Sequence, residues 1–97
     1  MEPEYVIGQF VFSKSGHDKG GLFIIINIEG EYLYLADGKV RIIEKPKKKK
    51  VKHVQKVSYV IEEIKEKIQG HSTLNNADLR KALSRYLEAS SKQRGGL

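Results

Sequence analysis

Short runs of β-branched and aromatic residues, separated by glycines, extend from Gly8 to Ile43. Residues of this kind suit the pleated surface of a sheet, so the pattern predicts strands. We expect four strands, at residues 9–14, 22–28, 32–35 and 39–43. Short strands that follow one another this closely favour a small curled antiparallel barrel of the SH3-like type, in which closure limits the exposed edges.

The second and third of these strands indicate where the core lies. Residues 22–28 are apolar at every position except Asn27, which predicts a central strand that is covered on both faces or lies in a curled barrel wall. In the third strand Leu33 and Leu35 alternate with two tyrosines, so we expect the leucines to face inward. The pair Asp37–Gly38 predicts a tight hairpin turn that leads into the fourth strand.

A first helix is indicated after the basic middle of the chain. Residues 51–54 could form a short closing strand before it, and we expect the neighbouring lysines to be exposed. Ser58 is the candidate N-cap of the helix, and apolar residues then recur at helical spacing up to Ile68. Gly70 is its expected end, because glycine readily adopts the left-handed conformation that follows many helices.

A second helix completes the expected fold. Asn75 or Asn76 is its candidate cap, and we expect the chain to fray after Ser90. One apolar stripe runs along it: Leu79, Leu83, Tyr86 and Leu87. The fold class is therefore mainly β with C-terminal helices. A barrel over residues 1–56, with a basic segment at 39–56, is followed by a two-helix extension over residues 57–97 that packs on it as one compact unit.

Positive charge is concentrated in the middle of the chain. Residues 1–38 hold two lysines against six acidic residues, a net charge of −4, whereas residues 39–56 hold nine basic residues against Glu44 alone, a net charge of +8. Residues 57–97 hold seven basic and five acidic residues, a net charge of +2. Lysine and arginine at this density attract polyanions, so the middle segment predicts a polyanionic partner.

Several classes of function are disfavoured by composition. The chain has no cysteine, which removes disulfides, thiolate metal sites and cysteine nucleophiles and is compatible with a cytoplasmic protein. Its longest apolar run is far shorter than a membrane helix, and acidic residues stand where a secretory signal would be basic. Zinc motifs need closely spaced ligands, and the three histidines are far apart, at His17, His53 and His71. We therefore expect no catalysis, metal, cofactor or small-molecule substrate, and no segment that spans a membrane.

The basic segment allows three interpretations: a solvated connector, a contact with anionic lipid, or a contact with nucleic acid. Lys39 and Arg41 lie on an expected strand, so part of the charge is mounted on rigid structure. The apolar side chains that membrane insertion requires are absent beside it. These features favour RNA or DNA, and we expect no membrane partner. Tyr32 and Tyr34, on one face of a strand, could stack on unpaired bases, although core packing is the commoner role of such residues.

Residues 7–20, with the sequence IGQFVFSKSGHDKG, resemble a KOW motif, in which Gly20 takes the place of the defining glycine. This motif occurs in ribosomal proteins and in transcription elongation factors. The resemblance implies an SH3-like barrel that binds structured RNA through the loop at residues 13–20. It also implies that the chain has no enzymatic activity.

A second resemblance extends the first across residues 6–56. Residues 34–41, the basic run from Lys45 to Lys49 and the pair His53–Val54 are similar to the fourteenth e-type large-subunit ribosomal protein family of archaea and eukaryotes and to its bacterial KOW relatives. This resemblance implies that the bound RNA is ribosomal RNA of the large subunit.

The candidate RNA-binding residues belong to the loop and the basic segment. They are Ser13, Lys14, Gly16, His17, Lys19, Gly20, Lys39, Arg41, Lys45, Lys47, Lys48, Lys49, Lys50, Lys52 and His53. A lysine-dominated surface contacts phosphates and reads the shape of folded RNA more than its sequence. The expected partners are RNA and ribosomal proteins beside it. The alternative is a protein-interaction module that docks on a transcription or translation factor through leucines of the second helix.

Overall fold

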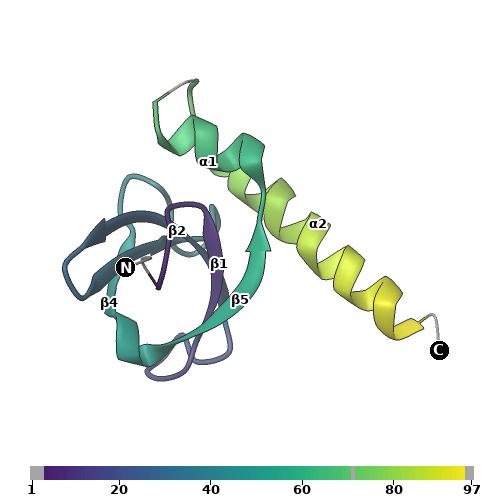
Figure 1. Cartoon of the computed structure of the whole chain (residues 1–97), viewed down its shortest axis with the longest axis horizontal. Coiled ribbons are helices and arrows are strands. Elements are labelled where there is room, and N and C mark those ends of the chain that lie inside the picture. The colour runs from purple at the N-terminus through teal and green to yellow at the C-terminus, as the bar shows by residue number, and fades with distance from the viewer. Residues whose placement is uncertain (1–3, 71, 96–97) are drawn as a thin grey trace.

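The chain folds into a curled sheet with helices at its C-terminal end. The computed structural model describes residues 4–70 and 72–95. The elements are β1 (Gln9–Ser13), β2 (Leu22–Glu29), β3 (Tyr32–Ala36), β4 (Lys47–Lys50), the 3-10 turn η1 (Val51–His53), β5 (Val54–Val60), α1 (Glu62–Ile68) and α2 (Asn76–Gly95). The strands pair antiparallel in the order β4–β3–β2–β1–β5, with both helices to one side (Figure 1). The expected mainly β fold with C-terminal helices is confirmed.

β2 is the central strand, as its apolar sequence predicts, and both of its faces are covered. Phe23 and Ile25 belong to an inner cluster together with Leu33 and Leu35 of β3. Ile24 belongs to an outer cluster that includes residues of both helices. The two-residue alternation of side chains therefore builds two cores from one strand, and the leucines of β3 face inward as expected.

The sheet curls because its two edge strands follow each other directly in the chain. Only η1 separates Lys50 at the end of β4 from Val54 at the start of β5, and four residues span about 14 Å at most. In a flat sheet of five strands the two edges would lie about 19 Å apart. Figure 1 shows the chain passing from β4 to β5 around the end of the curled sheet. No ladder joins β4 to β5 among the described strands, so the sheet is curled but not closed.

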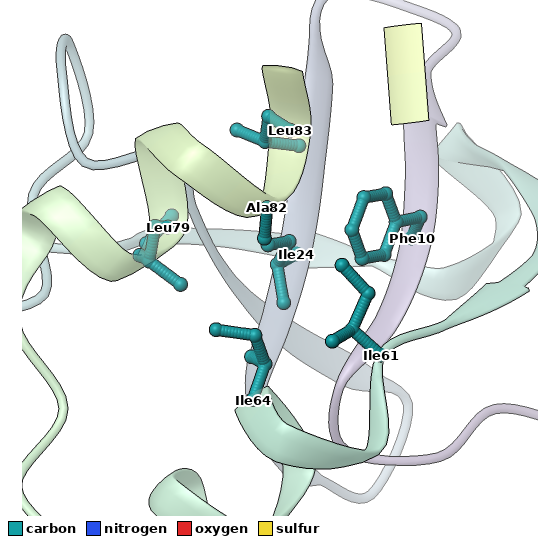
Figure 2. Packing of buried hydrophobic residues seen from close by; sticks show 8 residues of the cluster. Phe10, Ile24, Ile61, Ile64, Leu79, Ala82 and Leu83 are labelled. Carbon is teal, nitrogen blue, oxygen red and sulfur yellow. The ribbon is translucent and has the colours of Figure 1, made fainter. Parts of the chain in front are cut away.

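The outer cluster joins the helices to the sheet. Its buried members are Phe10, Ile24, Ala36, Ile61, Ile64, Leu79, Ala82 and Leu83. Figure 2 shows Phe10 and Ile24 of the strands facing the helical residues. The ring centroid of Phe10 lies 5.0 Å from that of Tyr59 and 5.7 Å from that of Tyr86, so rings from β1, β5 and α2 pack together. Burial of this apolar surface holds the helices on the outer face of the sheet.

The strand expected at residues 39–43 does not form, because the Asp37 side chain organises a loop there. Its carboxylate accepts hydrogen bonds from the backbone N–H groups of Lys39 at 2.9 Å and Arg41 at 2.8 Å. A type I′ hairpin needs positive φ at both central residues. Gly38 has φ +77°, but among the described residues only glycines have positive φ, so Asp37 does not meet that need. Residues 37–46 are therefore a loop.

The segment before α1 also differs from the expectation. Ser58 is not a helix cap, since β5 continues through it to Val60, which pairs with Gln9 of β1. Pairing with β1 outweighs the local capping signal, and α1 begins two residues after β5 ends. The closing strand expected at residues 51–54 begins only at Val54 and is longer than predicted. Gly70, with φ +92°, follows the end of α1 as predicted.

α2 begins where the sequence predicts. The backbone N–H of Asp78 donates to Asn75 Oδ1 at 2.9 Å, and the backbone N–H of Asn75 donates to Asp78 Oδ2 at 3.0 Å. These reciprocal bonds form a capping box, which satisfies two amides at the helix start. The helix continues past Ser90, where we expected it to fray.

Candidate nucleic-acid interface

The lysine run is the edge strand β4, and its register against β3 divides the four lysines into two pairs. Lys47 and Lys49 lie opposite the inward leucines of β3, whereas Lys48 and Lys50 lie opposite its outward tyrosines. Successive side chains of a strand point to opposite faces, so neighbouring lysines have different surroundings. The run is therefore ordered, and only one pair stands on the outer face.

On this outer face two tyrosines and two lysines lie together. Lys48 Nζ lies 4.7 Å from the ring centroid of Tyr32 and 5.9 Å from that of Tyr34, and Lys50 Nζ lies 6.0 Å from that of Tyr32. The Tyr34 hydroxyl donates to Glu29 Oε1 at 3.1 Å, and Lys48 Nζ is 3.9 Å from the same oxygen. We call Tyr32, Tyr34, Lys48 and Lys50 the tyrosine–lysine face. It combines cationic groups with aromatic rings, a combination found where proteins bind nucleic acids.

Lys49 is buried, which corrects the expectation that all lysines of the run are exposed. Its side chain is 8% exposed, and Nζ donates to Ser13 Oγ at 2.8 Å, to the Ser15 carbonyl at 2.8 Å and to Asp18 Oδ1 at 2.5 Å. An ammonium has three donors, and all three are used here. Lys49 and Ser13, both proposed as RNA contacts, therefore link β4 to the β1–β2 loop across the interior of the curled sheet.

The Asp18 carboxylate is held in its charged form by these contacts. Burial by itself raises the pKa of Asp18, but hydrogen bonds from Lys49 and Ser13, together with the charges of Lys49 and Lys47, outweigh burial. The pKa of Asp18 is consequently lowered from its ordinary value of 3.8. The ion pair between Lys49 and Asp18 thus contributes to the stability of the fold at every pH at which Asp18 is ionised.

Two loops that are distant in sequence meet around a hollow of about 390 Å³. His17 and Lys19 of the β1–β2 loop line one side, Arg41 and Val40 of the 37–46 loop line the other, and Phe23 contributes an aromatic wall. The structure therefore brings three predicted site residues, two of them basic, around one depression. The hollow lies beside Asp18, so the buried Lys49 contact also positions one of its walls.

The β1–β2 loop folds back on itself through its glycines. Gly16 and Gly20 have φ values of +84° and +88°, as the turn prediction required. The Gly20 N–H donates to the Ser13 carbonyl at 2.9 Å, and the Gly21 N–H donates to the Asp18 carbonyl at 2.9 Å. These two amides hold the loop, so they are not donors for a phosphate in this conformation.

The other predicted residues lie at further places on the surface. The Lys14 N–H donates to the His53 carbonyl at 2.8 Å, which places the start of the β1–β2 loop beside η1, where Lys52 is exposed. Lys45 is exposed in the 37–46 loop. The basic residues thus form several separate groups around the sheet.

Arg80 of α2 is a basic residue that the sequence analysis missed. Its Nη1 donates to the Gly38 carbonyl at 2.6 Å, and with Lys39 it lines a second hollow of about 340 Å³ between the 37–46 loop and the helix. The contact depends on how α2 packs against the loop. No short-range signal in the sequence could therefore have connected Arg80 with Lys39.

Comparisons with known proteins do not identify a relative of this chain: no family model matches it, and neither does any curated protein.

Within residues 4–70 and 72–95 no three acidic or histidine side chains gather where they could hold a metal ion. His71, one of the three histidines considered above, lies outside these residues. No helix in the described part of the chain is long and apolar enough to span a bilayer.

Proposed function

We propose that this chain is a non-catalytic RNA-binding protein of the cytoplasm, in which an SH3-like barrel of the KOW type presents lysines to phosphates. The observation that carries the proposal is the fixed position of Lys48 and Lys50 on the outer face of an edge strand. A cation held by a strand loses less conformational entropy on binding than one on a disordered run. Five antiparallel strands whose two edges are joined by a three-residue turn support the barrel.

The RNA that the sequence resemblance favours is ribosomal RNA of the large subunit, with ribosomal proteins as neighbours. The candidate basic contacts are spread over β4, the β1–β2 loop and the 37–46 loop rather than gathered on one element. Such a distribution suits the phosphate backbone of folded RNA, because the deep groove of duplex RNA hides the base edges from side chains.

A protein-interaction module is the second candidate, and one observation favours it. Leu87 of α2 is 54% exposed, with hollows of about 340 Å³ and 370 Å³ beside it. Leu79 and Leu83, which we expected to share this contact, are buried against the sheet and are not available to a partner. An apolar contact at Leu87 would tolerate high salt, unlike phosphate binding.

The salt dependence of RNA binding tests the proposal. The double variant Lys48→Gln/Lys50→Gln should bind a labelled RNA hairpin more weakly than the parent chain. Its plot of log affinity against log salt should be shallower by about 1.5, because each lost phosphate contact removes about 0.7–0.9 from the slope. Fluorescence anisotropy at several potassium chloride concentrations measures both quantities. Lys49 stays in place, since it is buried in the fold.

Lys81→Gln/Arg85→Gln is the charge-matched control, because it removes two positive charges that are both exposed on α2. Its slope should equal that of the parent chain, and an unchanged slope in the variant Lys48→Gln/Lys50→Gln would exclude β4 from the interface.

Sedimentation of cell extract through sucrose gradients tests whether the chain associates with the ribosome. Salt-sensitive migration with the large subunit is the expected result. Binding that survives high salt but is lost in Leu87→Ser would select the protein-interaction alternative.

A further inference from the structure

The tyrosine–lysine face occupies the part of the outer sheet surface that the helices leave uncovered. On β3 the outward positions are Tyr32, Tyr34 and Ala36, and Ala36 is fully buried in the cluster shared with α1 and α2. The two tyrosines lie further along the same strand, toward the β2–β3 turn. One strand face therefore passes from a packed core to an open surface, and aromatic side chains stand on the open part.

The exposure of Tyr32 distinguishes it from the other described tyrosines. Tyr5 packs against the inner cluster, and Tyr59 and Tyr86 pack against the outer cluster. Tyr32 is 38% exposed, and its ring lies near the ammonium groups of Lys48 and Lys50 rather than under apolar side chains. Its surroundings are thus those of a binding surface in which cationic groups stand beside an exposed ring.

We propose that this face binds an unpaired nucleobase of RNA, which stacks on the ring of Tyr32 while Lys48 and Lys50 hold the flanking phosphates. The inference rests on the proposed RNA-binding function and specifies the kind of RNA. The Lys48 ammonium lies over the Tyr32 ring and moves to a phosphate as the base takes its place. Stacking of a base on an exposed aromatic ring is stronger than an exposed cation–π contact, so this exchange is favourable.

The charges on the face also give the RNA a direction. Glu29 of β2 and the two lysines of β4 belong to strands on opposite sides of β3, but the Glu29 carboxylate that holds the Tyr34 hydroxyl also lies 3.9 Å from Lys48 Nζ and competes with phosphate for it. Phosphates are repelled by the carboxylate and attracted by the two ammonium groups. The RNA backbone therefore lies along β4, with its base directed over β3 toward the tyrosines.

Tyr32→Leu tests the inference, since it keeps an apolar side chain but removes the stacking ring. Its binding to a single-stranded RNA of about ten nucleotides should be about tenfold weaker, within the range found when a stacking aromatic is removed. Its binding to a fully paired RNA duplex, and its salt slope on either RNA, should be unchanged. Ile42→Ser is the control for loss of an exposed apolar side chain, because Ile42 is 38% exposed like Tyr32, and both affinities should be retained.

A second readout follows the tyrosines directly. The chain has no tryptophan and five tyrosines, so its intrinsic fluorescence comes from tyrosine. Single-stranded RNA should quench part of this emission in the parent chain and less of it in Tyr32→Leu. Equal affinity of parent and Tyr32→Leu for single-stranded RNA would overturn the stacking inference and leave the proposed function standing. Failure of the parent chain to bind either RNA would instead overturn the proposed function.

Discussion

Replacing Lys49 by methionine is expected to lower the free energy of unfolding by about 3–5 kcal/mol, a large part of the stability of a small domain. Methionine keeps much of the apolar stem but removes the ammonium. The Asp18 side chain, only 13% exposed, would then carry a charge without its cation, and Ser13 would lose a hydrogen-bond partner. Urea unfolding followed by circular dichroism measures the loss.

Lys48→Met is the matched control, because it makes the same change one residue earlier on the same strand. The Lys48 side chain is 50% exposed and lies 3.9 Å from Glu29, so we expect a loss of no more than about 1 kcal/mol. Adding Asp18→Asn to Lys49→Met should restore part of the stability, since no charge then remains unpaired. Similar losses in the two single lysine variants would contradict a structural role for the Lys49–Asp18 pair.

The same ion pair predicts a loss of stability in acid. The pKa of Asp18 in the folded protein is below its ordinary value of 3.8, so the unfolded chain takes up the proton first as pH falls. The contribution of Asp18 is therefore complete above about pH 5, decreases as pH falls through 4, and disappears below the folded-state pKa. The difference in unfolding free energy between the parent chain and Asp18→Asn should shrink over this range. A difference that is independent of pH would contradict it.

Local alternation explains why β1, β2 and β3 could be predicted from the sequence. Apolar residues cover nearly all of β2, and Leu33 and Leu35 alternate with tyrosines in β3. The central position of β2 in the sheet and the inward face of β3 therefore follow from neighbouring residues alone. β4 could not be predicted in this way. Four lysines show no alternation and have low strand propensity, and the run becomes a strand only because β3 offers a free edge.

The composition of the candidate site was predictable, but the role of each lysine was not. Lys48 and Lys49 are identical neighbours in the sequence. Only the register of β4 on β3 turns Lys48 outward over Tyr32 and Lys49 inward to Asp18. The partner of Lys49 is 31 residues away in the chain, beyond any short sequence window.

The loop at residues 37–46 is held against α2, and Gly38 is the residue at which this contact is most sensitive to substitution. Gly38 has φ +77°, and a Cβ at this position would overlap the backbone carbonyl oxygen of Asn76. Around it, Arg80 donates to the Gly38 carbonyl, and the Ile43 N–H donates to Asn76 Oδ1 at 2.8 Å. A side chain at Gly38 must therefore displace backbone, because the two atoms nearest to its Cβ belong to the Asn76 backbone and only the third, Arg80 Cγ, belongs to a flexible side chain.

Gly38→Ala should consequently lower the free energy of unfolding by about 2–5 kcal/mol, through the left-handed backbone and the overlap with α2 together. Gly30→Ala is the matched control: Gly30 has φ +60°, but nothing lies within 4 Å of a Cβ there, so only the backbone cost of about 1–2 kcal/mol remains. Thermal and urea unfolding of the two variants measure the difference. Equal destabilisation would mean that the 37–46 loop is not pressed against α2, and that the positions of Lys39 and Arg41 are not fixed by the helix.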